Sequence, residues 1–304
     1  MSLSGTIFGF GASSAIDDRS ELLRLTQQAD RDGLDLFSVS DHPYFGDRLD
    51  AYATVGFVLG QTRRLAGLVN VTNSPTRHAP MLARTVTSLS ALSGERVVLG
   101  MGAGGLWDRI SAMGVPRLSP SDAVDAFEEA ITLIRKLSGG GPPITYEGRH
   151  FRVEQLAPAP VSAPPVWTGS NGRKSLAATG RVADGWIPGH AADWLSKRYR
   201  ESRPVIDEAA AAAGRDPREV RTIYNFPGTI TERPLAATRD ENGRWIGGSV
   251  EQWIEELTGA IVEHGASGFI LFSAEGGTHD SVSLGRWACE IVPAIREAIQ
   301  AVPA

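Results

Sequence analysis

The stretch Val97-Val98-Leu99-Gly100-Met101-Gly102-Ala103-Gly104-Gly105 places a glycine-rich turn directly after a short apolar run. Its glycines fit the G-x-G-x-x-G pattern of a dinucleotide-binding turn. Such a site also needs a helix that starts on the last glycine and an acidic residue after the next strand. Here Gly114 and Pro116 keep any helix short, and Asp122 and Asp125 lie inside a later helical pattern. A tight strand-to-helix turn is therefore the favoured interpretation, with a dinucleotide site as the alternative.

Short apolar runs alternate with helical patterns on both sides of this turn. We expect strands over residues 6–12, 34–40, 65–72, 96–101, 165–169, 185–187, 220–226 and 268–272. We expect helices over residues 19–31, 51–63, 80–92, 121–137, 191–213 and 283–299, one that ends near residue 179, and one that Ser249 caps. Eight strand-plus-helix units predict parallel pairing and an α/β fold of the (β/α)₈ TIM barrel type. A doubly wound sheet is the alternative.

Two segments interrupt this alternation. Residues 142–165, after the fourth helix, contain six prolines and indicate a hairpin around Glu147-Gly148. Residues 227–248, after the seventh strand, form a second irregular insertion. The chain of 304 residues is 42% hydrophobic and can bury a large core, so we expect one barrel domain over residues 1–304.

The composition limits the partners of the chain. A net charge of -5 and the absence of a basic run argue against a nucleic-acid surface and an anionic membrane, and favour a small-molecule partner. The one cysteine, Cys289, has no disulfide partner, which indicates a reducing, cytoplasmic setting. The sequence has no signal-like N-terminus and no apolar stretch of membrane-spanning length. It also has no motif with metal-ligand spacing, so no metal is expected.

In a barrel the functional groups gather in the loops after the strands. His42 follows the second strand, and its ordinary pKa of about 6.5 suits proton exchange, although a lone histidine is often structural. The third strand ends in the polar run Asn70-Val71-Thr72, which can direct amide and backbone groups at a flat heterocycle or form an ordinary polar turn.

The fifth strand is followed by the small and basic run Gly169-Ser170-Asn171-Gly172-Arg173, which opens a helix. Free backbone N–H groups and a nearby cation at a helix N-terminus make an anion site, so phosphate binding is one interpretation. Capping of the helix by Ser170 or Asn171 is the other. Trp107 and Trp186 are candidates for the apolar walls of a ring site or for plain core residues.

Several motifs, taken in order, carry a family resemblance. They are Ser40-Asp41-His42-Pro43-Tyr44, Arg77-His78-Ala79-Pro80, Leu92-Ser93-Gly94-Glu95-Arg96, the run from Leu99 to Gly104, Tyr146-Glu147-Gly148-Arg149-His150-Phe151, Trp167-Thr168-Gly169, and the run from Gly180 to Trp186. With them the chain resembles the bacterial luciferase-like flavin- or deazaflavin-dependent oxidoreductases over nearly its whole length.

The resemblance implies a flavin-type cofactor, FMN or coenzyme F420, across the strand ends, with its phosphate near residues 169–173. It also implies a bulge against the isoalloxazine, with a non-proline cis peptide near Asn70-Val71. The expected cofactor contacts all lie at or just after strand ends. They are Asp41, Asn70, Val71, Thr72, Gly102, Ala103, Gly104, Gly169, Ser170, Asn171, Gly172, Arg173 and Trp186.

The resemblance also suggests a reaction. It implies hydride transfer to or from a small organic substrate, or oxygenation of it, with His42 as the catalytic residue that handles a proton or orients the substrate. Sugar-phosphate dehydrogenases of this family have an acidic glutamate after the fourth-strand glycines, whereas this chain has Gly105, which makes sugar-phosphate oxidation doubtful. A non-catalytic flavin-binding barrel is the alternative. Members of the family are often dimers, so the resemblance admits a homodimer.

Overall fold

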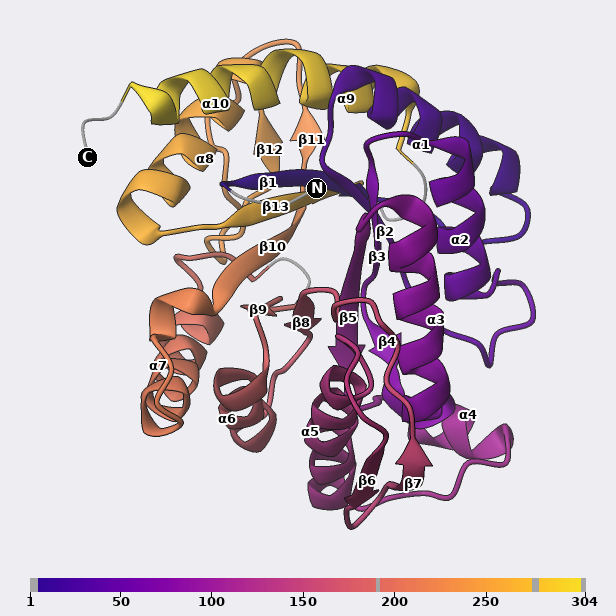
Figure 1. Ribbon diagram of the computed structural model, residues 1–304. Coiled ribbons are helices and arrows are strands. Elements are labelled where there is room, and N and C mark those ends of the chain that lie inside the picture. Colours follow the sequence, from indigo (N-terminus) through magenta and orange to yellow (C-terminus); the bar gives the residue numbers. More distant parts are fainter. Residues whose placement is uncertain (1–4, 190–191, 275–278, 302–304) are drawn as a thin grey trace.

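The barrel strands form a closed, parallel ring in the computed structural model, which describes residues 5–189, 192–274 and 279–301 (Figure 1). The strands are β1 (Ile7–Gly11), β2 (Leu36–Val39), β3 (Ala66–Val69), β5 (Val97–Gly102), β8 (Val166–Thr168), β9 (Gly185–Trp186), β10 (Arg221–Pro227) and β13 (Gly268–Phe272). Pairing of β3 with β5 and of β1 with β13 closes the ring. The (β/α)₈ prediction is therefore confirmed, and the doubly wound alternative is excluded.

Helices cover the outside of the ring (Figure 1). They are α1 (Arg19–Asp32), α2 (Ala51–Gln61), α3 (Ala79–Ser93), α4 (Trp107–Ala112), α5 (Pro120–Lys136), α6 (Arg173–Val182), α7 (Lys197–Ala212), α8 (Val250–His264), α9 (Ser281–Arg286) and α10 (Val292–Gln300). Local chemistry explains many of their ends. Ser119 and Ser249 cap α5 and α8 with their hydroxyls, and Gly94 ends α3 in the left-handed conformation. None of the helices in the described ranges is long and apolar enough to cross a bilayer.

Smaller elements occupy the two insertions. β6 (Ile144–Glu147) and β7 (Arg152–Leu156) form an antiparallel hairpin between α5 and β8, as the sequence predicts. β11 (Thr229–Ile230) and β12 (Gly247–Gly248) pair within the second insertion. β4 (Thr72–Asn73) follows β3 after a two-residue break and pairs with the end of β5.

Two helices differ from the prediction. α7 begins at Lys197, because the Ser196 hydroxyl caps it by accepting from the Tyr199 N–H; the predicted start at residue 191 lies outside the described residues. The last helix begins at Ser281 and contains a π-helical turn, Trp287–Ile291, just before Pro293. Proline has no N–H to donate and crowds the preceding turn, so a wider turn at this point is expected.

The core has two layers that follow from the alternation of side chains along each strand. One face of each strand points outward against the helices, as Phe8, Phe37 and Leu99 do. The other face fills the barrel, and its buried residues are Ile7, Leu36, Ala66, Leu68, Val98, Trp167, Ile187, Ile223 and Ile270. This alternation decides which residues at the strand ends reach the open end of the barrel.

Candidate functional site

We call the end of the barrel that holds the carboxyl ends of the strands the mouth. A polar layer lies there, above the apolar interior. The Asn70 amide group donates to Asn225 Oδ1 at 2.8 Å and to Ser38 Oγ at 3.4 Å. Asn225 lies in β10, Ser38 lies in β2, and Asn70 directly follows β3. Side chains alternate along each strand, and this alternation places all three side chains inside the ring. The polar layer fixes the Asn70 side chain below the bulge that follows it.

The bulge brings Val71 over the ends of two other strands. The Asn70-Val71 peptide bond is cis, as the family resemblance implies. A Cβ atom added at Gly102 would lie 2.7 Å from Val71 Cγ2, and one added at Gly169 would lie 3.1 Å from it. The missing side chains at these two glycines therefore make room for Val71, which offers a partly exposed apolar surface at the mouth.

His42 follows β2, at the same end of the barrel. Its Nδ1 is 2.8 Å from the Tyr44 hydroxyl, and its ring packs edge-on against Phe45. Burial lowers the pKa of His42, Asp41 opposes this effect, and Arg48 adds to it. The imidazole is consequently neutral at pH 7 and able to accept a proton.

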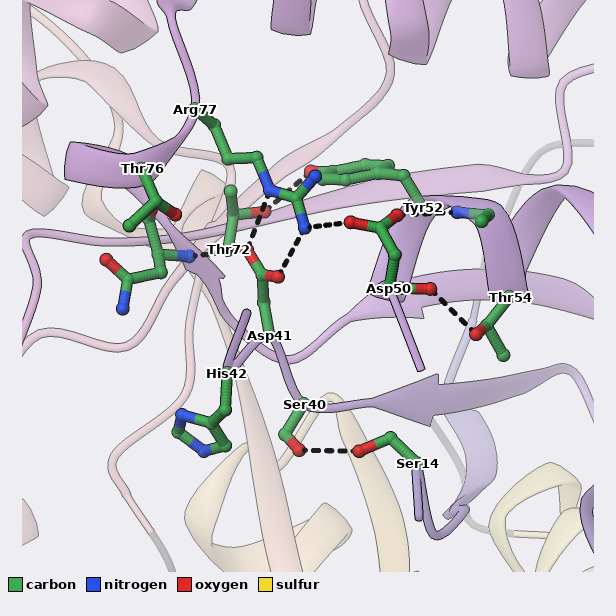
Figure 2. Close-up of polar contacts among 12 residues, drawn as sticks. Ser14, Ser40, Asp41, His42, Asp50, Tyr52, Thr54, Thr72, Thr76 and Arg77 are labelled. Atoms are coloured by element: carbon green, nitrogen blue, oxygen red, sulfur yellow. Dashed lines mark hydrogen bonds and ion pairs between the residues drawn. The ribbon is translucent and has the colours of Figure 1, made fainter. Parts of the chain in front are cut away.

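Asp41 points away from His42 and into a buried ion pair (Figure 2). Arg77 donates to both Asp41 oxygens, at 2.6 and 3.2 Å, and also to Asp50 at 2.6 Å. The Asn73 backbone N–H donates to Asp41 as well. The Asp41 side chain is only 1% exposed. Its bonds to Arg77 and Asn73 connect the loop after β2 to β4 and to the segment that follows β4.

Three further predicted contacts are buried in the same way. The Thr72 hydroxyl pairs with the Tyr52 hydroxyl at 2.6 Å, and the Thr72 side chain faces α2 (Figure 2). Trp186 is 0% exposed, and its indole donates to the Ser170 carbonyl. The Ser170 hydroxyl accepts from Thr179. The side chains of Asp41, Thr72, Ser170 and Trp186 are therefore buried in contacts within the protein.

The remaining residues of the predicted phosphate site are accessible: Gly169 is partly exposed, and Asn171, Gly172 and Arg173 are exposed. Neither of the predicted capping residues caps α6: Gly172 occupies the N-cap position, and the Asn171 side chain accepts from Arg198 at 3.2 Å. Arg173 follows as the first helical residue and is exposed. The capping interpretation is therefore excluded for Ser170 and Asn171. A glycine at the N-cap leaves the first-turn N–H groups without a side-chain acceptor from that position.

The sequence interpretation missed Asn225 and Phe272. Asn225 was detectable as a polar residue between the apolar neighbours of β10. Phe272 ends β13, and its ring lies against Gly11, where an added Cβ would be 2.2 Å from the ring. Both residues are partly exposed at the mouth.

Residues 3–277 match the model of the luciferase-like monooxygenase family. The chain belongs to this family. A glucose-6-phosphate dehydrogenase of Microbacterium testaceum, described as F420-dependent, is 28% identical over 225 residues, which cover 71% of this chain and 66% of that relative. The matched region thus spans slightly less than two thirds of the relative's own length.

Solved structures share the barrel of this luciferase-like chain. An F420-dependent secondary alcohol dehydrogenase in complex with an F420–acetone adduct superposes with a TM-score of 0.78 at 19% identity, covering 96% of this chain and 99% of the other. A riboflavin lyase with modified FMN and riboflavin gives a TM-score of 0.81 at 15% identity, covering 98% and 93%. At these identities the likeness supports the fold.

Proposed function

We propose that this luciferase-like protein is an oxidoreductase that binds F420 or FMN at the mouth and transfers a hydride to or from a small organic substrate. The observation that carries the proposal is the position of Val71 between Gly102 and Gly169, at the end of the barrel where a neutral His42 follows β2. A flat ring can lie against such an apolar surface at the strand ends, where barrels place their active sites.

In this proposal, separate residues support the ring, bind the phosphate and transfer the proton. Val71, Ala103 and Gly104 support the ring, and the N-terminus of α6 with Arg173 holds the phosphate. When bound there, F420 or FMN would supply the hydride chemistry. In the tautomer in which His42 Nδ1–H donates to the Tyr44 hydroxyl, Nε2 is free to take the proton of a substrate hydroxyl during oxidation or to return it during reduction.

The names of the relatives favour F420 over FMN, since the first relatives in sequence are described as F420-dependent. F420 is an obligate hydride carrier, whereas FMN also allows oxygenation. We do not extend the proposal to sugar phosphates, because Gly105 replaces the expected acid.

A hydride-transfer assay tests the function. Purified protein would be mixed anaerobically with oxidised F420 or FMN and a panel of small alcohols, and the cofactor absorbance would be followed. We expect loss of the oxidised spectrum with at least one cofactor–alcohol pair. Saturable cofactor binding without transfer in either direction would instead favour the non-catalytic flavin-binding barrel.

We also propose that the chain forms a homodimer through the outward faces of α2 and α3. Phe57 is 58% exposed and Met81 is 64% exposed, and an apolar groove of about 270 Å³ lies between α1 and α2 beside Phe57. α2 contains no charged residue, and such a helix is typically buried on both sides.

A further inference from the structure

Two amide side chains from opposite sides of the barrel meet at its mouth. Asn225 lies in β10 and Asn70 directly follows β3, and three strands separate β3 from β10 in either direction around the ring. The Asn70 amide nevertheless donates to Asn225 Oδ1 at 2.8 Å. These two side chains, which we call the amide pair, therefore cross the barrel interior and form the floor of the mouth.

Asn225 is a polar residue in a place that suits aliphatic side chains. Ile223, two residues earlier on β10, is buried inside the barrel, and so is Ile270, which pairs with Asn225 in register on β13. Alternation places the Asn225 side chain on the same inner face as Ile223, one level nearer the mouth. A polar group inside a protein is costly unless its atoms have hydrogen-bond partners, so each atom of this amide needs one.

The protein uses one end of the Asn225 amide and leaves the other end without a partner. Oδ1 accepts from Asn70, whereas Nδ2 has no hydrogen-bond partner among the residues that the structure describes. Nδ2 does not belong to the fully buried unpaired atoms, and Asn225 is partly exposed. A ligand can therefore reach this donor.

The accessible side of Asn225 opens to the mouth. Below the amide pair, buried apolar side chains that include Ile223 and Ile270 fill the barrel. On the outer face of β10, Tyr224 and Phe226 are buried in the core between the strands and the helices. A ligand atom that bonds to Nδ2 must consequently come from the mouth, where Val71 offers its apolar surface.

The amide pair is fixed within the protein. Ser38 Oγ lies 3.4 Å from Asn70 Nδ2, so Asn70 has contacts on β2 and on β10. In the orientation in which Asn70 donates to Asn225, Asn225 presents its NH₂ group to the mouth. A donor that is already held in place loses little conformational entropy when a ligand binds.

We propose that Asn225 binds the ring of the cofactor by donating a hydrogen bond from Nδ2 to a ring carbonyl oxygen. Both F420 and FMN carry carbonyl oxygens on the ring, and such an oxygen accepts from an amide N–H. The inference rests on the proposed function, which places the ring against Val71. It adds a polar contact to a surface that Val71, Ala103 and Gly104 otherwise make apolar.

Titration of F420 and FMN against Asn225→Asp tests the donor. The aspartate keeps an oxygen for Asn70 but replaces the NH₂ group by a second oxygen, which repels a ring carbonyl. At about pH 8, where aspartate is ionised, we expect the cofactor Kd to rise at least about tenfold. Asn225→Ala removes the donor without adding a charge and should raise the Kd about two- to tenfold.

Gln61→Glu is the matched control. It makes the same amide-to-carboxylate change at the exposed last residue of α2, which leads into β3 at the opposite end of the barrel. We expect it to leave the cofactor Kd unchanged. Urea denaturation of each variant separates lost binding from lost folding, and Asn225→Ala serves if Asn225→Asp does not fold.

Infrared difference spectroscopy of the bound cofactor separates a direct contact from an indirect effect through Val71. A hydrogen bond weakens the ring C=O bond, so the carbonyl band should lie at higher frequency in Asn225→Ala than in the parent protein. An unchanged Kd in both Asn225 variants, or an unchanged carbonyl band in Asn225→Ala, would overturn the inference and leave the proposed function standing. Failure of the parent protein to bind either cofactor would refute the proposed function and this inference together.

Discussion

Asp41 and His42 are adjacent in sequence but have opposite surroundings. The Asp41 carboxylate is buried against Arg77, whereas His42 is partly exposed at the mouth (Figure 2). Alternation along the extended chain after β2 accounts for the difference. A motif that contains both residues therefore combines one bracing residue with one candidate catalytic residue.

The lowered pKa of His42 predicts the pH dependence of alcohol oxidation. Burial favours the neutral imidazole, so the base form persists below the ordinary pKa of about 6.5. We expect kcat/KM to fall on the acid side with a midpoint below that value. His42→Gln should lower kcat by about 100- to 10,000-fold and remove this acid limb. An unchanged pH profile in His42→Gln would show that His42 handles no proton.

The Asp41–Arg77 pair predicts a stability effect. Asp41→Asn leaves Arg77 partly uncompensated in a buried place, so the free energy of unfolding should fall by about 3 kcal/mol in urea denaturation. Glu21→Gln removes the partner of Arg24 in an exposed pair and should cost less than about 1 kcal/mol. Equal small losses in both variants would contradict the bracing role of Asp41.

At the residue scale, the sequence identifies the strand-end segments but not the direction of each side chain. His42 and Val71 reach the mouth, while Thr72 and Trp186 turn into the protein. A motif gives only the position along the chain. The direction depends on where each strand starts its alternation and on the bulge after β3, and these are set by pairing with distant strands.

At the scale of elements, the end of β5 and the turn after it contain two glycines with different surroundings, Gly102 and Gly105. A Cβ at Gly102 would lie against Val71, whereas one at Gly105 would meet nothing within 4 Å. The G-x-G-x-x-G pattern alone does not distinguish the two positions.

This difference gives a matched pair of variants. Gly102→Ala should displace Val71, lower the free energy of unfolding by about 1–3 kcal/mol and weaken cofactor binding. Gly105→Ala should change stability by no more than about 0.5 kcal/mol and leave the cofactor Kd close to that of the parent protein. Cofactor fluorescence titration and urea denaturation measure both. Identical behaviour of the two variants would refute the role of Gly102 in making room for Val71.

Most elements could be predicted because their signals are local. The hairpin at Glu147-Gly148 and the cap at Ser249 are read directly from neighbouring residues. The start of α7 and the π-helical turn before Pro293 could not be predicted from the sequence. In α7 the cap interrupts a continuous helical pattern, and in the last helix the proline does so.

For the whole molecule, the count of eight strand-plus-helix units predicted the barrel, and closure between β3 and β5 and between β1 and β13 confirms it. Closure brings His42, Val71 and Gly169 to one mouth from distant parts of the chain. The extent of the domain, residues 1–304, and the cytoplasmic setting stay predictions.

The proposed dimer predicts a change in molecular mass. Light scattering after size exclusion should give twice the chain mass of 32.4 kDa for the parent protein and a lower mass for Phe57→Glu, which places a charge on the exposed face of α2. Val262→Glu, at an exposed apolar site on α8, is the control and should stay dimeric. A monomeric parent protein would contradict the proposal.

Cofactor titration tests the central claim most directly, because the account depends on a phosphate-bearing ring at the mouth. F420 and FMN would be titrated against the parent protein, Arg173→Gln and Lys174→Gln; Lys174 is the neighbouring cation and already pairs with Asp125 at 2.5 Å. We predict saturable binding of at least one cofactor, a roughly tenfold weaker Kd in Arg173→Gln and little change in Lys174→Gln. Failure of both cofactors to bind the folded parent protein would contradict the account.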